Sequence, residues 1–143
     1  MVLKRESVSG RLEELDRILS ELLLYESVTV DDLLDDLSQR WIIERGLIAA
    51  AGIILDIAEH ILVAHFGAYS NTYEASLAGI HERGVVSDTT YQQLKGLGGF
   101  RNILVHLYQD VDITQLWQNY RKALSVFPQF VREVTVWLDR VDL

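Results

Sequence analysis

The sequence contains no cysteine, and this absence excludes several kinds of protein at once. Without thiols there is no disulfide scaffold, no thiol nucleophile and no zinc site built on cysteine. A chain of 143 residues does not need such cross-links, because a domain of this length buries roughly 68–70% of the surface that its unfolded chain exposes. We therefore expect a single compact domain over residues 1–143.

Long hydrophobic runs are also missing. The longest apolar stretch, residues 47–55, has nine residues and is followed by Asp56 and Glu59, whereas a helix that spans a bilayer needs about 18 or more. The first ten residues, MVLKRESVSG, carry charges where a secretory signal would need apolar residues. The sequence therefore predicts a cytoplasmic protein that does not insert into a membrane.

Positive charge is scarce as well. The chain has 13 Lys and Arg against 21 Asp and Glu, which gives a formal net charge of −8. Contacts with phosphate groups need local positive charge, so we expect no broad nonspecific binding of nucleic acid and no DNA partner. A polyanionic partner would have to bind at a small basic site.

Strand-like alternation is absent, and apolar residues instead recur at spacings of three and four, which is typical of amphipathic helices. The sequence predicts an all-α bundle of four main helices and one short helix. The five segments are an amphipathic helix through residues 11–23, one long helix from Thr29 to Gly67, a short helix from Asn71 to near Gly84, a helix from Ser87 interrupted by glycines at positions 96, 98 and 99, and a last helix from Asp112. Pro128, the only proline, is expected to kink the last helix because it lacks a backbone donor.

An acidic run occupies residues 31–36, with aspartates at positions 31, 32, 35 and 36. Carboxylates at this place suit the positive end of a helix dipole. The alternative is a docking surface for a basic partner, and the sequence does not distinguish the two.

Familiar catalytic motifs are missing. No carboxylate lies three residues before any of the four histidines, as a two-metal helical bundle would need. Asp56 and His60 share a helix face but lack a third ligand, so we interpret them as a structural pair. The segment KGLGGFRN lacks the ending of a phosphate loop, and its glycines indicate a helix bend or close packing. We expect no metal and no cofactor.

The segment GFRNILVHLYQDVD, residues 99–112, places Arg101, Asn102, His106 and Tyr108 within eight residues. An arginine side chain offers a fork of donors to phosphate, and imidazole exchanges protons near neutral pH. Together they suit metal-independent cleavage of a phosphodiester: His106 would act as base or acid while Arg101 stabilises the phosphorane. Asn102 would orient the imidazole or donate to a phosphate oxygen. In the structural alternative, Arg101 forms an ion pair, Asn102 and His106 form a polar pair, and Tyr108 anchors the end of the bundle.

Helix geometry limits this interpretation. In a regular helix, Arg101 and His106 would lie about 140° apart around the axis and roughly 7.5 Å apart along it. Either the helix is distorted, or two chains pair and build a shared cleft, and we favour a homodimer. A dimer would also bring two copies of Arg45 to the groove, while Tyr108, seven residues after Arg101, would share its helix face.

These residues resemble the motif of the HEPN domains, and within them of the HepT toxins, which are encoded beside a small nucleotidyltransferase antitoxin, MntA. That motif is Arg-x4-His-x-Tyr, usually with Asn after the Arg, and Arg101, Asn102, His106 and Tyr108 follow it. The segment WIIERGLIAAAGIILDIAEHIL also resembles the second helix of that family. The helix order is similar over nearly the whole chain.

The resemblance implies the toxin of a type VII-like toxin–antitoxin pair: a homodimeric, metal-independent ribonuclease with Arg101 and His106 as the active pair. It also implies that the MntA-like partner attaches AMP to Tyr108 and so blocks RNA binding. Ile48 and Gly52 stand where family members often carry Gln and Glu, so we assign no catalytic carboxylate to that helix. The alternative is a HEPN module without catalysis that only docks a nucleotidyltransferase.

Overall fold

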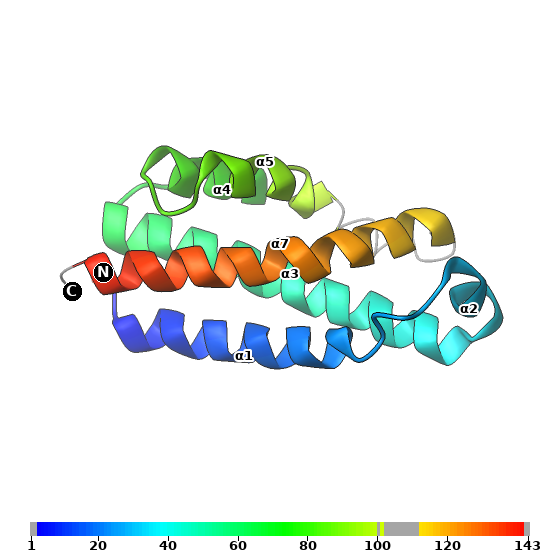
Figure 1. Cartoon of the computed structure of the whole chain (residues 1–143). Coiled ribbons are helices and arrows are strands. Elements are labelled where there is room, and N and C mark those ends of the chain that lie inside the picture. Colours follow the sequence, from blue (N-terminus) through cyan, green and yellow to red (C-terminus); the bar gives the residue numbers. More distant parts are fainter. Residues whose placement is uncertain (1–2, 100, 102–111, 142–143) are drawn as a thin grey trace.

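The computed structural model describes residues 3–99, 101 and 112–141, and over these residues the chain is helical with no strand. The helices are α1 (Arg5–Leu23), α2 (Val30–Asp35), α3 (Leu37–Phe66), α4 (Tyr73–Glu82), α5 (Asp88–Leu94) and α7 (Ile113–Arg140). The long helices α1, α3 and α7 run alongside one another, and α4 and α5 lie on the side of α3 away from α1 (Figure 1). The predicted all-α bundle is confirmed.

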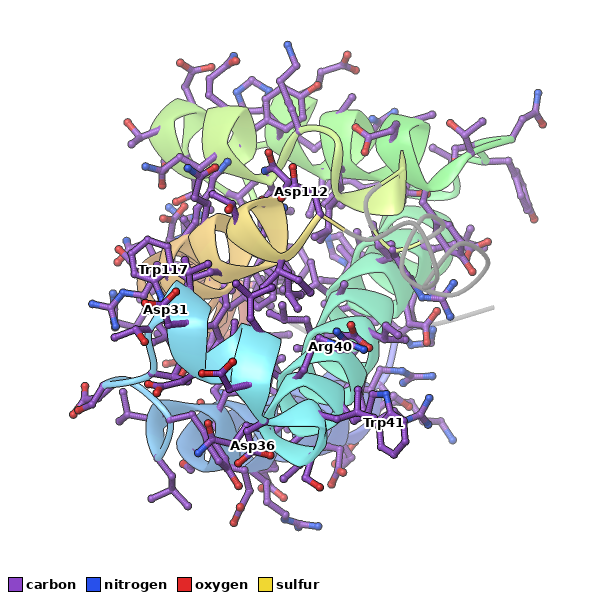
Figure 2. All side chains as sticks on the ribbon, turned by 90° about the vertical axis from the view of Figure 1, so that its right-hand side faces the viewer. Asp31, Asp36, Arg40, Trp41, Asp112 and Trp117 are labelled. Carbon is purple, nitrogen blue, oxygen red and sulfur yellow. The ribbon has the colours of Figure 1, made fainter. Side chains whose placement is uncertain are left out.

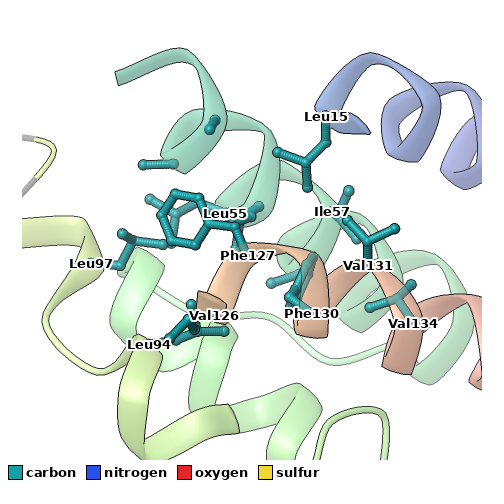
Figure 3. Packing of buried hydrophobic residues seen from close by; sticks show 14 of the residues in the cluster. Leu15, Leu55, Ile57, Leu94, Leu97, Val126, Phe127, Phe130, Val131 and Val134 are labelled. Carbon is teal, nitrogen blue, oxygen red and sulfur yellow. The ribbon is translucent and has the colours of Figure 1, made fainter. Parts of the chain in front are cut away.

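Helix α3 forms the centre of the hydrophobic core. Leu55 and Ile57 of α3 pack in one cluster with Leu15 of α1 and with Phe127 and Phe130 of α7 (Figure 3). By length and composition α3 could cross a membrane, but 56% of its most apolar window is buried inside the bundle. Its apolar character is therefore explained by the helices that cover it.

Helix ends follow the predicted capping residues at several places. The side chains of Thr29, Ser87 and Asp112 accept hydrogen bonds from the first turns of α2, α5 and α7. Gly67 ends α3 with φ of 63°, a left-handed conformation that favours glycine. These local signals were sufficient to place four helix boundaries.

The prediction of one uninterrupted helix from Thr29 to Gly67 is wrong, because the chain breaks at Asp36. This residue is extended, with φ of −114° and ψ of 96°, and its carboxylate accepts the N–H of Gln39 at 3.1 Å. One aspartate thus starts α3 directly after α2 ends. With Asp32 in the capping box of α2, two members of the acidic run satisfy helix N-termini, as predicted.

Two further boundaries differ from the prediction. Thr72, rather than Asn71, caps α4 and accepts the N–H of Ala75 at 3.0 Å. Helix α7 continues across Pro128, where the ring nitrogen has no proton for the carbonyl of Leu124. The kink expected at this proline stays a prediction.

Tyr120 of α7 joins two helices through its hydroxyl group. The residue is 0% exposed, its hydroxyl donates to the carbonyl of Leu22 at 2.5 Å, and burial raises its pKa to about 12. We expect Tyr120→Phe to lower the free energy of unfolding by about 1 kcal/mol, since a buried hydrogen bond is lost while the ring still fills its site. Urea unfolding measures the change, with Tyr69→Phe, at a residue 84% exposed, as the control. Equal midpoints for Tyr120→Phe and the wild type would contradict this role.

Candidate functional site

The structure places one residue of the predicted motif. Arg101 is described and half-buried, whereas Asn102, His106 and Tyr108 lie outside the described residues. The predicted convergence of Arg101 with His106 therefore stays a prediction. The structure does show which contacts place Arg101.

The turn that leads to Arg101 is fixed by the first turn of α4. Helix α5 ends at Leu94, and Gly96 has φ of 87°, a conformation that glycine adopts without strain. The carboxylate of Glu74 then accepts the N–H of Gly96 at 3.1 Å and that of Gly98 at 3.0 Å. Residues 97–99 are helical again, so these two hydrogen bonds hold the start of the segment that leads to Arg101.

Gly98 lies close to the first turn of α4 at the same place. A Cβ atom there would lie 3.4 Å from the Cβ of Tyr73 and 3.5 Å from a carboxylate oxygen of Glu74. The bend predicted for the glycines is confirmed at Gly96, whereas a Cβ at Gly98 would make ordinary van der Waals contacts. The hydrogen bonds of Glu74 were not predicted from the sequence.

The guanidinium group of Arg101 lies against α3 at Gly52. Its Nε is 3.3 Å, and its Nη2 3.8 Å, from the position that a Cβ of residue 52 would occupy. Glycine at this position therefore makes room for the arginine. The Nε is buried and has no hydrogen-bond partner among the described residues. An unpaired guanidinium N–H has a strong tendency to bind an anionic oxygen.

Gly52 contacts the candidate catalytic arginine, a role that the sequence did not predict for it. The available signal was its departure from the resembled family, which often carries a carboxylate there. The structure gives a physical meaning to this departure: a longer side chain would occupy the space that the guanidinium of Arg101 now fills.

Arg45 lies on the same helix, seven residues before Gly52, so both share one face of α3 about 10.5 Å apart along its axis. Arg45 is exposed and lines a groove of about 510 Å³ between α1 and α3. Trp41 and Ile42, which are 58% and 43% exposed, line the same groove. This face of α3 therefore combines a cation with large apolar side chains.

The residue before Arg45 on α3 is a buried carboxylate. Glu44 is buried, and its carboxylate is 3.7 Å from the Nε of Arg40. Burial raises the pKa of Glu44, and the positive charge of Arg40 opposes this shift. Figure 2 shows this end of the bundle, with Arg40 and Trp41 on α3, Asp31 on α2 and Trp117 on α7.

The pair formed by Asp56 and His60 lies further along α3. Asp56 is exposed and His60 is half-buried. Burial lowers the pKa of His60, and the nearby charge of Arg11 lowers it further. In the part of the chain that the structure describes, no three histidine or carboxylate groups gather as metal ligands would.

Comparison with known proteins agrees with the resemblance to the HepT family. Residues 11–134 match the family described as ribonuclease HepT-like. A relative named tRNA nuclease HepT, from Aphanizomenon flos-aquae, is 30% identical over 131 residues, which cover 92% of this chain and 89% of that protein.

Solved structures show the same fold. The tri-AMPylated HEPN toxin of Shewanella oneidensis, solved in complex with an MNT antitoxin, gives a TM-score of 0.82 at 17% identity, over 93% of this chain and 99% of that chain. YutE of Bacillus subtilis, a cytosolic protein of unknown function, gives a TM-score of 0.78 at 19% identity, over 96% of this chain and 92% of that chain. These structures establish the HEPN fold, and the family match over residues 11–134 establishes that this protein belongs to the HepT-like ribonuclease family.

Proposed function

We propose that this protein is a metal-independent RNA endonuclease and the toxin of a type VII-like toxin–antitoxin pair. The observation that carries the proposal is Arg101, which begins the Arg-Asn-x3-His-x-Tyr motif and lies against Gly52. Its Nε is buried and has no hydrogen-bond partner among the described residues. The name of the relative from Aphanizomenon flos-aquae makes tRNA the first substrate to test. We assign Arg101, His106 and Asn102 to catalysis.

In the proposed reaction the ribose 2′-oxygen attacks the adjacent phosphorus. A new bond forms between phosphorus and the 2′-oxygen, and the bond to the 5′-oxygen breaks. His106 either accepts the proton of the 2′-hydroxyl or donates a proton to the departing 5′-oxygen. Arg101 stabilises the negative charge on the phosphorane. The products are a 2′,3′-cyclic phosphate and a 5′-hydroxyl.

The active unit is a homodimer. A regular helix would separate Arg101 from His106 by about 140°, so a second chain is the simplest way to bring the two groups to one phosphate. The exposed side chains of Trp41 and Ile42 suit an interface on α3, and Arg45 would contribute positive charge to the groove beside it. Each chain would act as one HEPN domain in the cytoplasm.

The partner is an MntA-like nucleotidyltransferase antitoxin. It would transfer AMP from ATP to the hydroxyl of Tyr108, forming a phosphodiester and releasing pyrophosphate. The added phosphate and base would occupy the groove beside Arg101 and repel RNA. The Shewanella oneidensis toxin, which is tri-AMPylated in its complex with an MNT antitoxin, supports this part of the proposal. The second candidate, a module that only docks the partner, lacks the cleavage step.

Incubation of the purified protein with tRNA in excess EDTA tests the proposal. The expected result is fragments with 2′,3′-cyclic phosphate and 5′-hydroxyl ends. Cleavage that appears only when a divalent metal is added would contradict the metal-independent mechanism. Intact tRNA in every condition, together with binding of the nucleotidyltransferase, would support the docking module instead.

The contact between Arg101 and Gly52 gives a second prediction. We expect Gly52→Val to lower the rate of RNA cleavage about tenfold or more, because the new side chain displaces the guanidinium from α3 and small misplacements of catalytic groups are costly. Gly10→Val is the matched control, since a Cβ at Gly10 meets no atom within 4 Å. The measurement compares the RNA cleavage rates of Gly52→Val, Gly10→Val and the wild type, after thermal unfolding has shown that the three proteins are equally stable. A Gly52→Val protein as active as the control would show that this contact does not position Arg101.

A further inference from the structure

A groove of about 440 Å³ lies between α7 and the segment that runs from the end of α5 to Gly99. Its apolar floor includes Leu94, Leu97 and Phe127, and its polar lining includes Lys95 and Lys122. We propose that this groove binds a nucleotide of the RNA strand next to the scissile linkage. The inference rests on the proposed nuclease function and deepens it by naming a substrate-binding site.

The charge of the groove points to an anionic ligand. The chain has only three lysines, at positions 4, 95 and 122, and two of them line this groove, whose described lining residues include no carboxylate. Three other grooves in the described part of the chain each include a glutamate: Glu21, Glu133 and Glu59. In a chain with a net charge of −8, a groove whose described lining has two cations and no carboxylate fits phosphate.

The uncharged side chains of the groove suit a nucleobase. Gln93, Gln115 and Asn119 line it with amide groups, which both donate and accept hydrogen bonds. The apolar floor can cover the face of a base, and a cavity of this size falls within the range of small-ligand sites. The ammonium group of Lys95 is 5.9 Å from the ring centre of Tyr91, so a cation–π interaction holds it at the rim.

The groove is also lined by residues that are close in the sequence to the candidate catalytic arginine. Gly96 and Gly99 line it, and Gly99 is two residues before Arg101. The hydrogen bonds from Gly96 and Gly98 to the carboxylate of Glu74 thus fix both one wall of the groove and the segment that leads to Arg101. An RNA strand bound in the groove would therefore contact the turn that leads to Arg101.

RNA binding by Lys95→Ala/Lys122→Ala tests this inference. Both substitutions are made in a His106→Ala background to prevent cleavage, and fluorescence anisotropy with labelled tRNA gives the affinity. Two lost contacts with single-stranded RNA should weaken binding roughly 25-fold at 0.1 M salt and lower the slope of log affinity against log salt by about 1.4. In the otherwise wild-type protein, kcat/KM should fall by a similar factor.

Two further variants separate the parts of the site. Lys4→Ala/Arg132→Ala removes the same charge outside the groove and should leave the affinity and the salt slope unchanged. Gln115→Leu/Asn119→Leu should weaken binding severalfold and alter the base preference while keeping the salt slope, because amides contact the base and not the phosphate.

The outcomes distinguish this inference from the proposed function. If wild-type protein cleaves tRNA and the double lysine variant binds and cleaves equally well, the groove proposal is wrong and the nuclease stands. If tRNA stays intact but its binding depends on the two lysines, RNA binding by the groove is supported and the nuclease proposal fails. If the double lysine variant loses only the nucleotidyltransferase partner, the groove is a protein-docking site and our inference is overturned.

Discussion

His106→Ala is expected to slow RNA cleavage about 10²–10⁴-fold, the usual contribution of a general acid or base. The imidazole is the only group in the motif that exchanges protons readily near neutral pH, so its loss leaves the 2′-hydroxyl or the leaving oxygen without a partner. Single-turnover cleavage of tRNA in EDTA measures the effect. His65→Ala is the control, because His65 is an exposed histidine on the last turn of α3.

A double variant shows whether the two residues serve one step. If Arg101 and His106 act on the same phosphate, Arg101→Ala/His106→Ala should be about as inactive as the slower single variant, since groups that act as a unit are strongly non-additive. Losses that multiply would indicate independent roles. Undiminished cleavage by His106→Ala, with wild-type folding, would remove His106 from the mechanism.

The fold followed from the sequence where the determining signals are local. Thr29, Ser87 and Asp112 each cap a helix within three residues of their own position, so the side chain and its partner are read together. The break at Asp36 was missed because it interrupts no apolar pattern. A capping side chain contributes only about 1 kcal/mol, and whether a helix continues or restarts at such a residue depends on how both parts pack.

The same distinction between local and long-range signals applies to the candidate site. Arg101 could be proposed as a site residue because its neighbours in the motif are close to it in the sequence. Its surroundings could not, because Gly52 comes from α3 and Glu74 from α4, and the hydrogen bonds of Glu74 span 22 and 24 residues. A glutamate in the first turn of a helix has an obvious local role, and only the assembled bundle shows that its carboxylate binds two backbone N–H groups of another segment.

The last prediction concerns the proposed switch. Incubated with the nucleotidyltransferase partner and ATP, the wild-type protein should gain the mass of AMP and lose nuclease activity in proportion to the modified fraction. Tyr108→Phe should gain no AMP and stay active in the presence of the partner. The physical reason is electrostatic and steric, because in the proposed site a phosphodiester on Tyr108 would add a negative charge for Arg101 to bind and a base that excludes RNA.

Among the tyrosines that the structure describes, Tyr69 is 84% exposed and Tyr73 is 40% exposed. A transferase that needed only an accessible hydroxyl would therefore also modify Tyr69. Tyr120 is excluded by its burial and its hydrogen bond to Leu22. Tyr69→Phe is therefore the matched control and should accept AMP like the wild type. If Tyr108→Phe still gains AMP and Tyr69→Phe does not, the modification follows exposure, and the inhibition assigned to Tyr108 is wrong.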